Sequence, residues 1–378
     1  MSIVVAPDSF KGSLTADEAA AAIAGGVGRV LPDAEVLLRP VADGGEGTVA
    51  AALRAGYAAR VVRVSGPDGC PVEAVFALDA ETAVLELASA AGIGLLPRPA
   101  PLTAGTHGVG ELVRAALDTG ARRIVLGIGG SATTDGGAGM LQALGVRLLD
   151  ADGAELPAGG AALTRLHRVD AAGLDSRLAD VTFVVASDVD NPLTGPAGAA
   201  PVFAPQKGAS EADVAALDAA LGHYAAVLAR DLGVDVDAVP GAGGTGGTAA
   251  GALAVGATVV SGAGLVCDLV DLGGVLRGAD LVITGEGSLD EQSLRGKAPA
   301  EVAARARSAG VPCLALAGAV RLSAEQIENA GFVAAHALTE VEPDLARCLA
   351  EPAPVLTDLA ARVVPGWADQ GWRSAPRT

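Results

Sequence analysis

The chain has 378 residues, only 2% of them aromatic, and its 26 Lys and Arg against 44 Asp and Glu give a formal charge of −18. One hydrophobic core stops growing at about 250 to 300 residues, so the length predicts two domains. The negative charge, spread along the sequence, disfavours nucleic acid and anionic membranes as partners. There is no membrane-length apolar run, no leader-like segment and no C-x-x-C pair, so we expect a soluble, cytoplasmic protein.

The N-terminal part is predicted to contain two β-α units followed by a β-meander. An apolar strand that ends at Pro7 precedes an alanine-rich helix, for which Ser13 or Thr15 is the expected cap. A second strand at 35–42 leads to a helix at 48–56. Residues 59–92 then alternate short strands with the turn sequences "GPDG" and "DAET", which interrupts the α/β rhythm.

The remaining elements follow in chain order. We expect helices at 105–120 and 139–145 and strands at 123–130, 146–150 and 181–189. Residues 190–210 are too rich in proline and glycine for a helix and long enough to suggest function. Helices at 210–232 and 247–257 follow, and from residue 279 strands alternate with helices up to about residue 338. The polar end, residues 367–378, is expected to fray.

These elements predict an α/β fold with two different α/β domains. A flavodoxin-like or Rossmann-like parallel-sheet domain would comprise residues 1–65 and 260–378. A mixed α/β domain, residues 66–259, would be inserted into it, with each boundary uncertain by about ten residues. The cleft between the domains is the expected place for the active site.

Several glycine-rich loops follow predicted strands or precede predicted helices. "DGGEGT" at 43–48 is echoed by "DGGAGM" at 135–140, and glycine allows backbone N–H groups to approach a phosphate closely. The alternative for either copy is a glycine turn whose aspartate caps a helix. Only three basic residues are lysine, and each lies beside a glycine, as expected for binding of anionic oxygens: Lys11, Lys207 and Lys297.

The standard nucleotide-binding motifs are missing. "PDSFKGS" stands where a dinucleotide enzyme would have G-x-G-x-x-G, and no G-x-x-x-x-G-K-[ST] loop occurs. Two acidic pairs follow predicted strands instead, Asp188 with Asp190 and Glu286 with Asp290. Mg²⁺ takes one or two carboxylates plus substrate phosphates, so these pairs predict either a metal site or turn and cap residues.

Taken in order, the loops resemble the signatures of the bacterial glycerate kinase family. The stretches that carry the resemblance span residues 6 to 299 and are "APDSFKGSL", "ADGGEGT", "GIGGSATTDGGAGM", "DVDNPLTG", "FAPQKGA" and "LVITGEGSLDEQSLRGKAP". Two departures are Ser187, where the family usually has cysteine, and "GAGGTGGT" where it usually has "GAGAAGG". Neither removes a charged group. The resemblance implies transfer of phosphate from ATP to D-glycerate with Mg²⁺, giving 2-phosphoglycerate and ADP.

The roles of individual residues are assigned by their chemistry. We expect Asp43 and Asp188 to orient or deprotonate the attacking hydroxyl. Lys297 is also assigned to catalysis and, like Lys11 and Lys207, is expected to neutralise the charges of phosphate and of the glycerate carboxylate. Glu46 is expected only to cap the helix that begins at Thr48. Substrate and phosphate binding is assigned to Ser9, Lys11, Gly44, Gly45, Ser131, Thr133, Asp135, Asn191 and Lys207. Metal binding, directly or through water, is assigned to Asp190, Glu286 and Asp290.

Three alternatives stay open at this point. The product could be 3-phosphoglycerate, or the acceptor could be another small hydroxy acid. The same loops could also form a non-catalytic binder of an anionic metabolite, because phosphate loops do not require turnover. A small-molecule substrate is the expected partner in each case, and a homodimer is compatible with the sequence.

Overall fold

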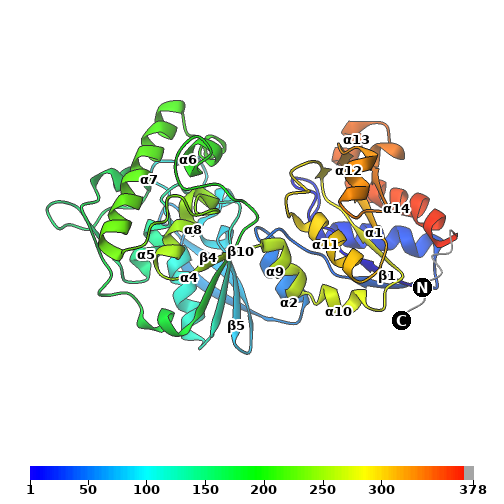
Figure 1. The fold of residues 1–378 in the computed structure, drawn as a ribbon, viewed down its shortest axis with the longest axis horizontal. Coiled ribbons are helices and arrows are strands. Elements are labelled where there is room, and N and C mark those ends of the chain that lie inside the picture. Colours follow the sequence, from blue (N-terminus) through cyan, green and yellow to red (C-terminus); the bar gives the residue numbers. More distant parts are fainter. Residues whose placement is uncertain (370–378) are drawn as a thin grey trace. The chain divides into compact units, whose positions relative to one another are not determined.

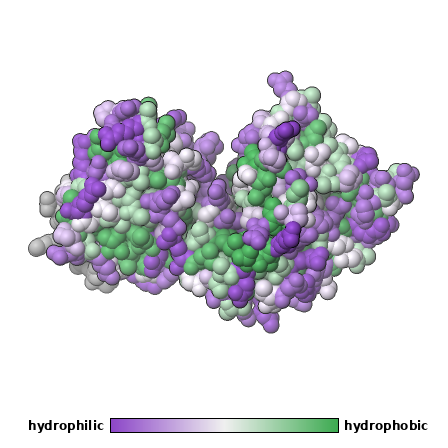
Figure 2. Space-filling view, turned by 180° about the vertical axis from the view of Figure 1, so that it is seen from behind, coloured by the Kyte–Doolittle hydropathy of each residue, from purple (hydrophilic) through white to green (hydrophobic). Residues whose placement is uncertain are grey.

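The computed structural model describes residues 1–369 and divides into two compact units (Figure 1). Unit 1 consists of Met1–Asp43 together with the chain from Ala263 onward, and unit 2 is Gly44–Gly262. Unit 1 thus carries both ends of the colour scale in Figure 1, blue and yellow to red. Hydrophilic residues are scattered over the face drawn in Figure 2, as expected from the even spread of charge along the sequence.

Unit 1 is built on a five-stranded sheet in which every neighbouring pair of strands is parallel. Its order is β2-β1-β11-β13-β15, which matches the flavodoxin-like order when the strands are counted within the unit. The three central strands, β1, β11 and β13, are apolar and largely buried on both faces, as is usual for a covered parallel sheet. The five strands are β1 Ser2–Val5, β2 Glu35–Leu38, β11 Leu281–Thr284, β13 Cys313–Ala317 and β15 Ala334–Ala337. A two-stranded ribbon adds β12 Ser288–Leu289 and β14 Ala319–Val320.

Helices cover this sheet. They are α1 Ala16–Val30, α10 Leu272–Leu276, α11 Ala298–Ser308, α12 Ala324–Asn329, α13 Leu345–Ala350 and α14 Pro352–Asp369, with a 3₁₀ turn η5 Leu338–Glu340. Of the two expected caps of α1, the structure uses Thr15, which forms a reciprocal capping box with Glu18. Helices α1 and α14 pack so closely that a Cβ at Gly26 would lie 2.3 Å from the Thr357 carbonyl oxygen.

Unit 2 contains a six-stranded mixed sheet of order β10-β9-β6-β5-β4-β3. The expected meander forms its antiparallel half, and the strands from β5 to β10 are parallel. The strands are β3 Ala58–Ser65, β4 Pro71–Asp79, β5 Thr82–Glu86, β6 Arg123–Gly127, β9 Thr182–Ala186 and β10 Thr258–Val260. The expected parallel sheet and mixed sheet are therefore both confirmed.

The helices of unit 2 pack into two hydrophobic clusters. They are α2 Thr48–Arg54, α3 Ala88–Ala91, α4 His107–Asp118, α5 Ala138–Ala143, α6 Ala199–Phe203, α7 Glu211–Leu232 and α8 Gly244–Ala254, with 3₁₀ turns η1 Ile93–Leu95, η2 Gly160–Arg165, η3 Ser176–Asp180 and η4 Pro205–Lys207. Within the described residues, α7 alone is long and apolar enough to cross a membrane. One face of α7 is buried in the core of unit 2, as in core helices of soluble proteins, so a soluble protein is not contradicted.

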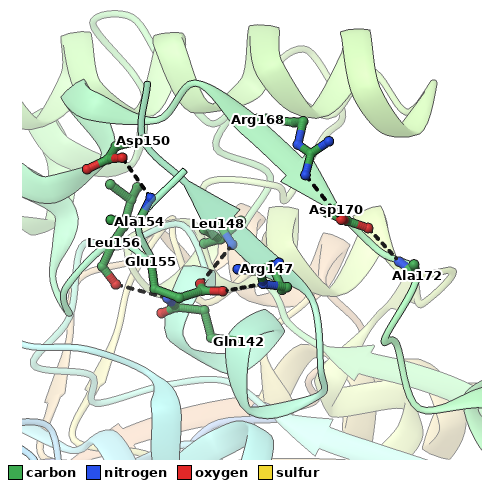
Figure 3. Close-up of polar contacts among 10 residues, drawn as sticks. All are labelled: Gln142, Arg147, Leu148, Asp150, Ala154, Glu155, Leu156, Arg168, Asp170 and Ala172. Atoms are coloured by element: carbon green, nitrogen blue, oxygen red, sulfur yellow. Dashed lines mark hydrogen bonds and ion pairs between the residues drawn. The ribbon is translucent and has the colours of Figure 1, made fainter. Parts of the chain in front are cut away.

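A small antiparallel ribbon, β7 Arg147–Leu149 with β8 Arg168–Asp170, lies next to α5 (Figure 3). Glu155 is bonded to strand β7 of this ribbon: its carboxylate pairs with Arg147 at 2.7 Å and accepts a hydrogen bond from the Leu148 N–H. The α5 side chain of Gln142 donates to the Leu156 carbonyl at 3.0 Å. These contacts are local and polar, and none of the predicted site residues takes part in them.

Three expectations about the fold need correction. The first boundary between the compact units lies at residues 43/44 rather than near 65, because β3 pairs with β4 along its whole length and α2 packs on β4 and β5. The second boundary, expected near 260, lies at 262/263, at the start of helix α9 Gly262–Leu269, and needs no correction. Residues 190–210 do contain a helix, α6, whose small and apolar residues find a place in the core. Of the end that was expected to fray, residues 367–369 belong to α14, and residues 370–378 lie outside the described residues.

Candidate active site

The sheet of unit 1 has a topological switch point between β1 and β11. From β1 the chain continues to β2 on one side, and from β11 it continues to β13 on the other. In open α/β sheets the loops that follow the strands at such a point form the ligand-binding crevice. Here the two loops are joined directly, since the Asp8 N–H donates to the Gly285 carbonyl at 2.8 Å.

Lys11 and Asp43 meet at this edge of unit 1. Lys11 follows β1, Asp43 follows β2, and Lys11 Nζ lies 3.1 Å from Asp43 Oδ2. Asp43 is the main cause of a raised Lys11 pKa, which keeps the ammonium charged. The Lys11 side chain is 73% exposed and that of Asp43 21%. Because the Lys11 side chain is largely exposed, this pair contributes at most about 1 kcal/mol of stability.

Asp8 is the residue that the sequence reasoning missed at this site. It is only 4% exposed, and its carboxylate accepts a hydrogen bond from the N–H of half-buried Ser9 at 2.6 Å. Burial, and then the charge of Asp43, raise the pKa of Asp8 to about 7, whereas Lys11 lowers it. Its position directly after the first strand, in the same "PDSFKGS" loop as Lys11, was the available signal.

Glu286 brings a further carboxylate to the switch point. It is 9% exposed, and its Oε1 has no hydrogen-bond partner among residues 1–369. Burial raises the Glu286 pKa, while the Ser293 hydroxyl and the charge of Lys297, the residue just before α11, lower it. Asp290 acts on Glu286 through its charge, and it also shapes the loop, because its Oδ1 accepts the Gln292 N–H.

The charges of this cluster suit a divalent cation. With all groups ionised, four carboxylates and two ammonium groups carry a formal charge of −2: Asp8, Asp43, Glu286 and Asp290 against Lys11 and Lys297. Residues 1–369 contain no ready-made group of three or more metal-ligating side chains. Mg²⁺ does not need one, because it takes one or two carboxylates and completes its shell with phosphate and water. The unpartnered Glu286 Oε1 fits that requirement.

In unit 2 the predicted phosphate ligands gather in the loop that follows β6, but most of them are buried. Lys207 is 2% exposed, and its Nζ donates to Ser131 Oγ at 2.9 Å and to the Thr133 carbonyl. Ser131 is 6% exposed and Thr133 fully buried. Burial lowers the pKa of Lys207 to about 7, although the charge of Asp135 opposes this. The structure therefore places Lys207 inside the unit and in contact with protein groups.

Asp135 is fully buried and accepts four hydrogen bonds. The donors are the N–H and hydroxyl of Thr106 and the N–H groups of Gly137 and Gly139, at 2.8 to 3.2 Å. Burial raises its pKa, and these donors oppose the shift. Asp135 thus joins the start of α4 to the start of α5. Direct phosphate binding by Asp135, as expected from the sequence, has no support in this geometry, because all these donors belong to the protein.

Gly44 and Gly45 also serve close packing. Gly44 has φ +87°, and a Cβ there would lie 2.5 Å from Gly262 Cα. A Cβ at Gly129 would lie 2.8 Å from Gly45 Cα. Their role as phosphate donors stays a prediction, because a backbone that requires glycine for packing explains these positions equally well.

Glu46, the residue expected to cap α2, does not do so. Glu46 is exposed, and the carboxylate at the start of α2 comes from β5 instead. Glu86 Oε1 accepts the Val49 N–H at 2.6 Å, and burial raises the Glu86 pKa. A contact between residues 37 positions apart cannot be read from the local sequence.

The loop after β9 carries the remaining predicted residues. Asp188 Oδ1 accepts hydrogen bonds from Ser261 Oγ at 3.1 Å and from the Gly262 N–H at 2.8 Å. Asn191 donates its amide N–H to the Ala197 carbonyl at 2.8 Å, and Asp190 is exposed. These hydrogen bonds fix the loop that follows β9, so Asp188 and Asn191 have a structural role. Their chemical roles stay predictions.

Three comparisons with known proteins cover nearly the whole chain. The model of the glycerate kinase family matches residues 3–368. A glycerate kinase of Halalkalibacterium halodurans is 47% identical over 89% of this chain and 90% of its own length. A glycerate 2-kinase of Escherichia coli K12 is 46% identical over 90% of each chain. A crystal structure assigned as glycerate kinase 2 from Salmonella typhimurium LT2 aligns with a TM-score of 0.83 at 42% identity, over 98% of this chain and 99% of that one.

Proposed function

Because this chain belongs to the glycerate kinase family, and is therefore an ATP-dependent phosphotransferase, we propose that it phosphorylates D-glycerate at the 2-hydroxyl. The products are 2-phosphoglycerate and ADP. The observation that carries the proposal is the carboxylate and lysine cluster at the switch point of unit 1, in a chain that matches the family from residue 3 to residue 368. The choice of the 2-hydroxyl rests on the similarity to the glycerate 2-kinase of Escherichia coli.

In the proposed reaction the substrate oxygen forms a bond to the γ-phosphorus of ATP. The bond between that phosphorus and the β,γ-bridging oxygen breaks, and ADP leaves with the bonding electrons. Asp43 accepts the proton of the attacking hydroxyl, because its carboxylate is partly exposed and held in place by Lys11. Lys11 and Lys297 offset the negative charge of the phosphates.

Mg²⁺ is the expected cofactor. When bound, it neutralises phosphate charge and draws the phosphate oxygens into position. Glu286 is the residue proposed to hold it, directly or through water, because one of its buried oxygens lacks a protein partner in the described chain. Asp290 shapes the loop that carries Glu286. Nucleic acid and membranes are not expected as partners, and a cytoplasmic location and a homodimer remain compatible with the proposal.

The test is an assay of ADP release by the purified protein with ATP, Mg²⁺ and D-glycerate. The same mixture without glycerate is the control, and a longer hydroxy acid tests the substrate class. A proton-coupled ³¹P spectrum of the product then identifies the hydroxyl, because a 2-phosphate couples to one C–H proton and a 3-phosphate to two. Glycerate-dependent ADP release with a doublet supports the proposal. A triplet would overturn the 2-hydroxyl assignment, and ADP release that does not depend on glycerate would overturn the substrate.

A further inference from the structure

Lys207 connects two segments of unit 2 that are far apart in the sequence. Its Nζ donates to Ser131 Oγ and to the Thr133 carbonyl, both in the loop that follows β6. On its other side lies the glycine-rich segment 241–247, where a Cβ at Gly246 would be 2.9 Å from Lys207 Nζ and 2.0 Å from the Thr133 oxygen. The ammonium group is therefore enclosed by the two segments.

The two segments also contact each other around this ammonium. The Gly136 N–H donates to the Gly246 carbonyl at 3.0 Å, and Ser131 Oγ lies 3.4 Å from the Thr245 carbonyl. Thr245 adopts φ 56°, ψ 47°, a left-handed conformation that is unfavourable for a residue other than glycine. A strained residue of this kind persists only where its surroundings hold it in place. The bonds of Lys207 are part of those surroundings.

A buried ammonium is an expensive way to join two loops. Burial lowers the Lys207 pKa, and the nearby charge of Asp135 only partly compensates. Apolar residues of similar volume can stabilise a protein as well as a buried charge does, so a charge kept in the interior suggests a task other than stability. The bonded residue Ser131 stands at the carboxyl end of β6, where α/β sheets bind their ligands.

We propose that Lys207 is a positioning residue for the kinase reaction: it fixes the 129–135 loop against the 241–247 segment, and with it Ser131, a residue predicted from the sequence to bind phosphate, without touching the phosphate itself. This inference rests on the proposed function for the role of Ser131. It replaces the expectation from the sequence that Lys207 binds phosphate directly. All three lysines were assigned alike from the sequence, and the structure separates the buried one from the exposed Lys11.

The first test measures hydrogen–deuterium exchange of the ligand-free protein. Lys207→Met keeps most of the side-chain volume and removes the charged donor. We expect exchange in residues 129–137 and 241–248 to become about tenfold faster, the scale of losing a hydrogen bond to a charged group. Lys11→Met is the matched comparison, because it removes an exposed lysine from the proposed phosphate-binding set and should leave exchange in these two segments unchanged.

The second test separates positioning from a merely structural role. With D-glycerate saturating, Lys207→Met is expected to raise the KM for ATP about tenfold and to lower kcat less. Ser131→Ala should reproduce most of this effect, and the double variant should be little worse than either single one, since both residues act through the same bond. If Lys207→Met does not fold, both the hydrogen–deuterium exchange and the KM for ATP are measured on Ser131→Ala alone.

The outcomes decide between the alternatives. Unchanged exchange together with lost ATP affinity would mean that Lys207 binds phosphate directly, and unchanged exchange with unchanged kinetics would mean that it has no role. Additive effects of Ser131→Ala and Lys207→Met would also overturn the proposal. The exchange experiment needs no substrate. If the wild-type protein is inactive with glycerate, the proposed function is wrong, but the exchange rates measured in residues 129–137 and 241–248 still test the role of Lys207.

Discussion

The two copies of the D-G-G-x-G sequence begin alike and differ in what surrounds their aspartates. Asp43 ends unit 1 and makes an ion pair with Lys11 that solvent can reach. Asp135 lies inside unit 2 with no exposed surface and four protein donors. The first aspartate is the one predicted to act in the chemistry, whereas the second joins the starts of two helices.

The glycines of the two copies also differ in their conformations and surroundings. Gly136 and Gly137 both have positive φ, and a Cβ at Gly136 would lie 2.7 Å from the Tyr224 ring. In the copy at 43–48, Gly47 has φ 98° at the start of α2, and the carboxylate at this helix start comes from Glu86. The repeated motif thus precedes a helix twice but turns differently, with left-handed glycines at Gly44 and Gly47 in one copy and at Gly136 and Gly137 in the other. The partners of the two aspartates come from distant residues and differ as well.

The largest effect that would test this comparison is expected for Asp43→Asn. We predict that kcat falls by about 10² to 10³-fold, because a general base contributes on that scale. The midpoint of thermal unfolding should change little, since the pair with Lys11 is exposed. Glu46→Gln, in the same loop and exposed, is the control and should leave kcat unchanged. A folded Asp43→Asn enzyme with normal turnover would remove Asp43 from the chemistry.

A smaller effect of a different kind is expected for Asp135→Asn. The amide offers one acceptor oxygen where the carboxylate offers two, so at least one buried donor loses its partner. We predict a loss of about 1 to 3 kcal/mol in the free energy of unfolding, measured with urea. In the protein that remains folded, kcat should fall less than that of Asp43→Asn. The opposite order of the two variants in kcat would mean that Asp135 is the chemical residue.

The smallest effect concerns the lysine that accompanies each copy. Lys207 has a pKa of about 7 in the folded protein against 10.5 ordinarily, so the unfolded chain binds more protons between these values. The free energy of unfolding should therefore rise with pH above 7, by up to about 1.4 kcal/mol per pH unit. The pKa of Asp8 is raised from 3.8 to about 7, so the titration of Asp8 changes the free energy of unfolding mainly below pH 7.

Urea unfolding of wild type and Lys207→Met at pH 7, 8 and 9 measures this contribution. The difference between the two proteins should change in favour of wild type as the pH rises, because methionine does not titrate. Lys11→Met is the comparison, since the Lys11 pKa is raised and its ammonium stays charged throughout this range. A difference that stays constant from pH 7 to 9 would show that folding does not lower the Lys207 pKa.

Local patterns were sufficient for most of the fold. The apolar runs predicted the strands of both sheets except β10, the "GPDG" and "DAET" turns predicted the meander, and Thr15 was one of two caps named for α1. The family signatures and their order predicted the enzyme class, because each signature is a short segment whose identity does not depend on its neighbours in space. The boundary near residue 65 was wrong because the pairing of β3 with β4 assigns this segment to unit 2.

The candidate site was predicted in its residue types and only partly in its arrangement. Sequence alone placed Lys11, Asp43 and Glu286 in loops after strands, and it named glycine-rich turns as the scaffold. Tertiary structure decided which charges are buried, and burial sets both accessibility and pKa. The pairing of β1 with β11 places Asp8 at the candidate site, which the sequence did not predict. Lys207 and Asp135, which the sequence assigned to phosphate binding, are buried. The chain thus encodes which groups are present, whereas the packing of distant segments decides which of them a substrate can reach.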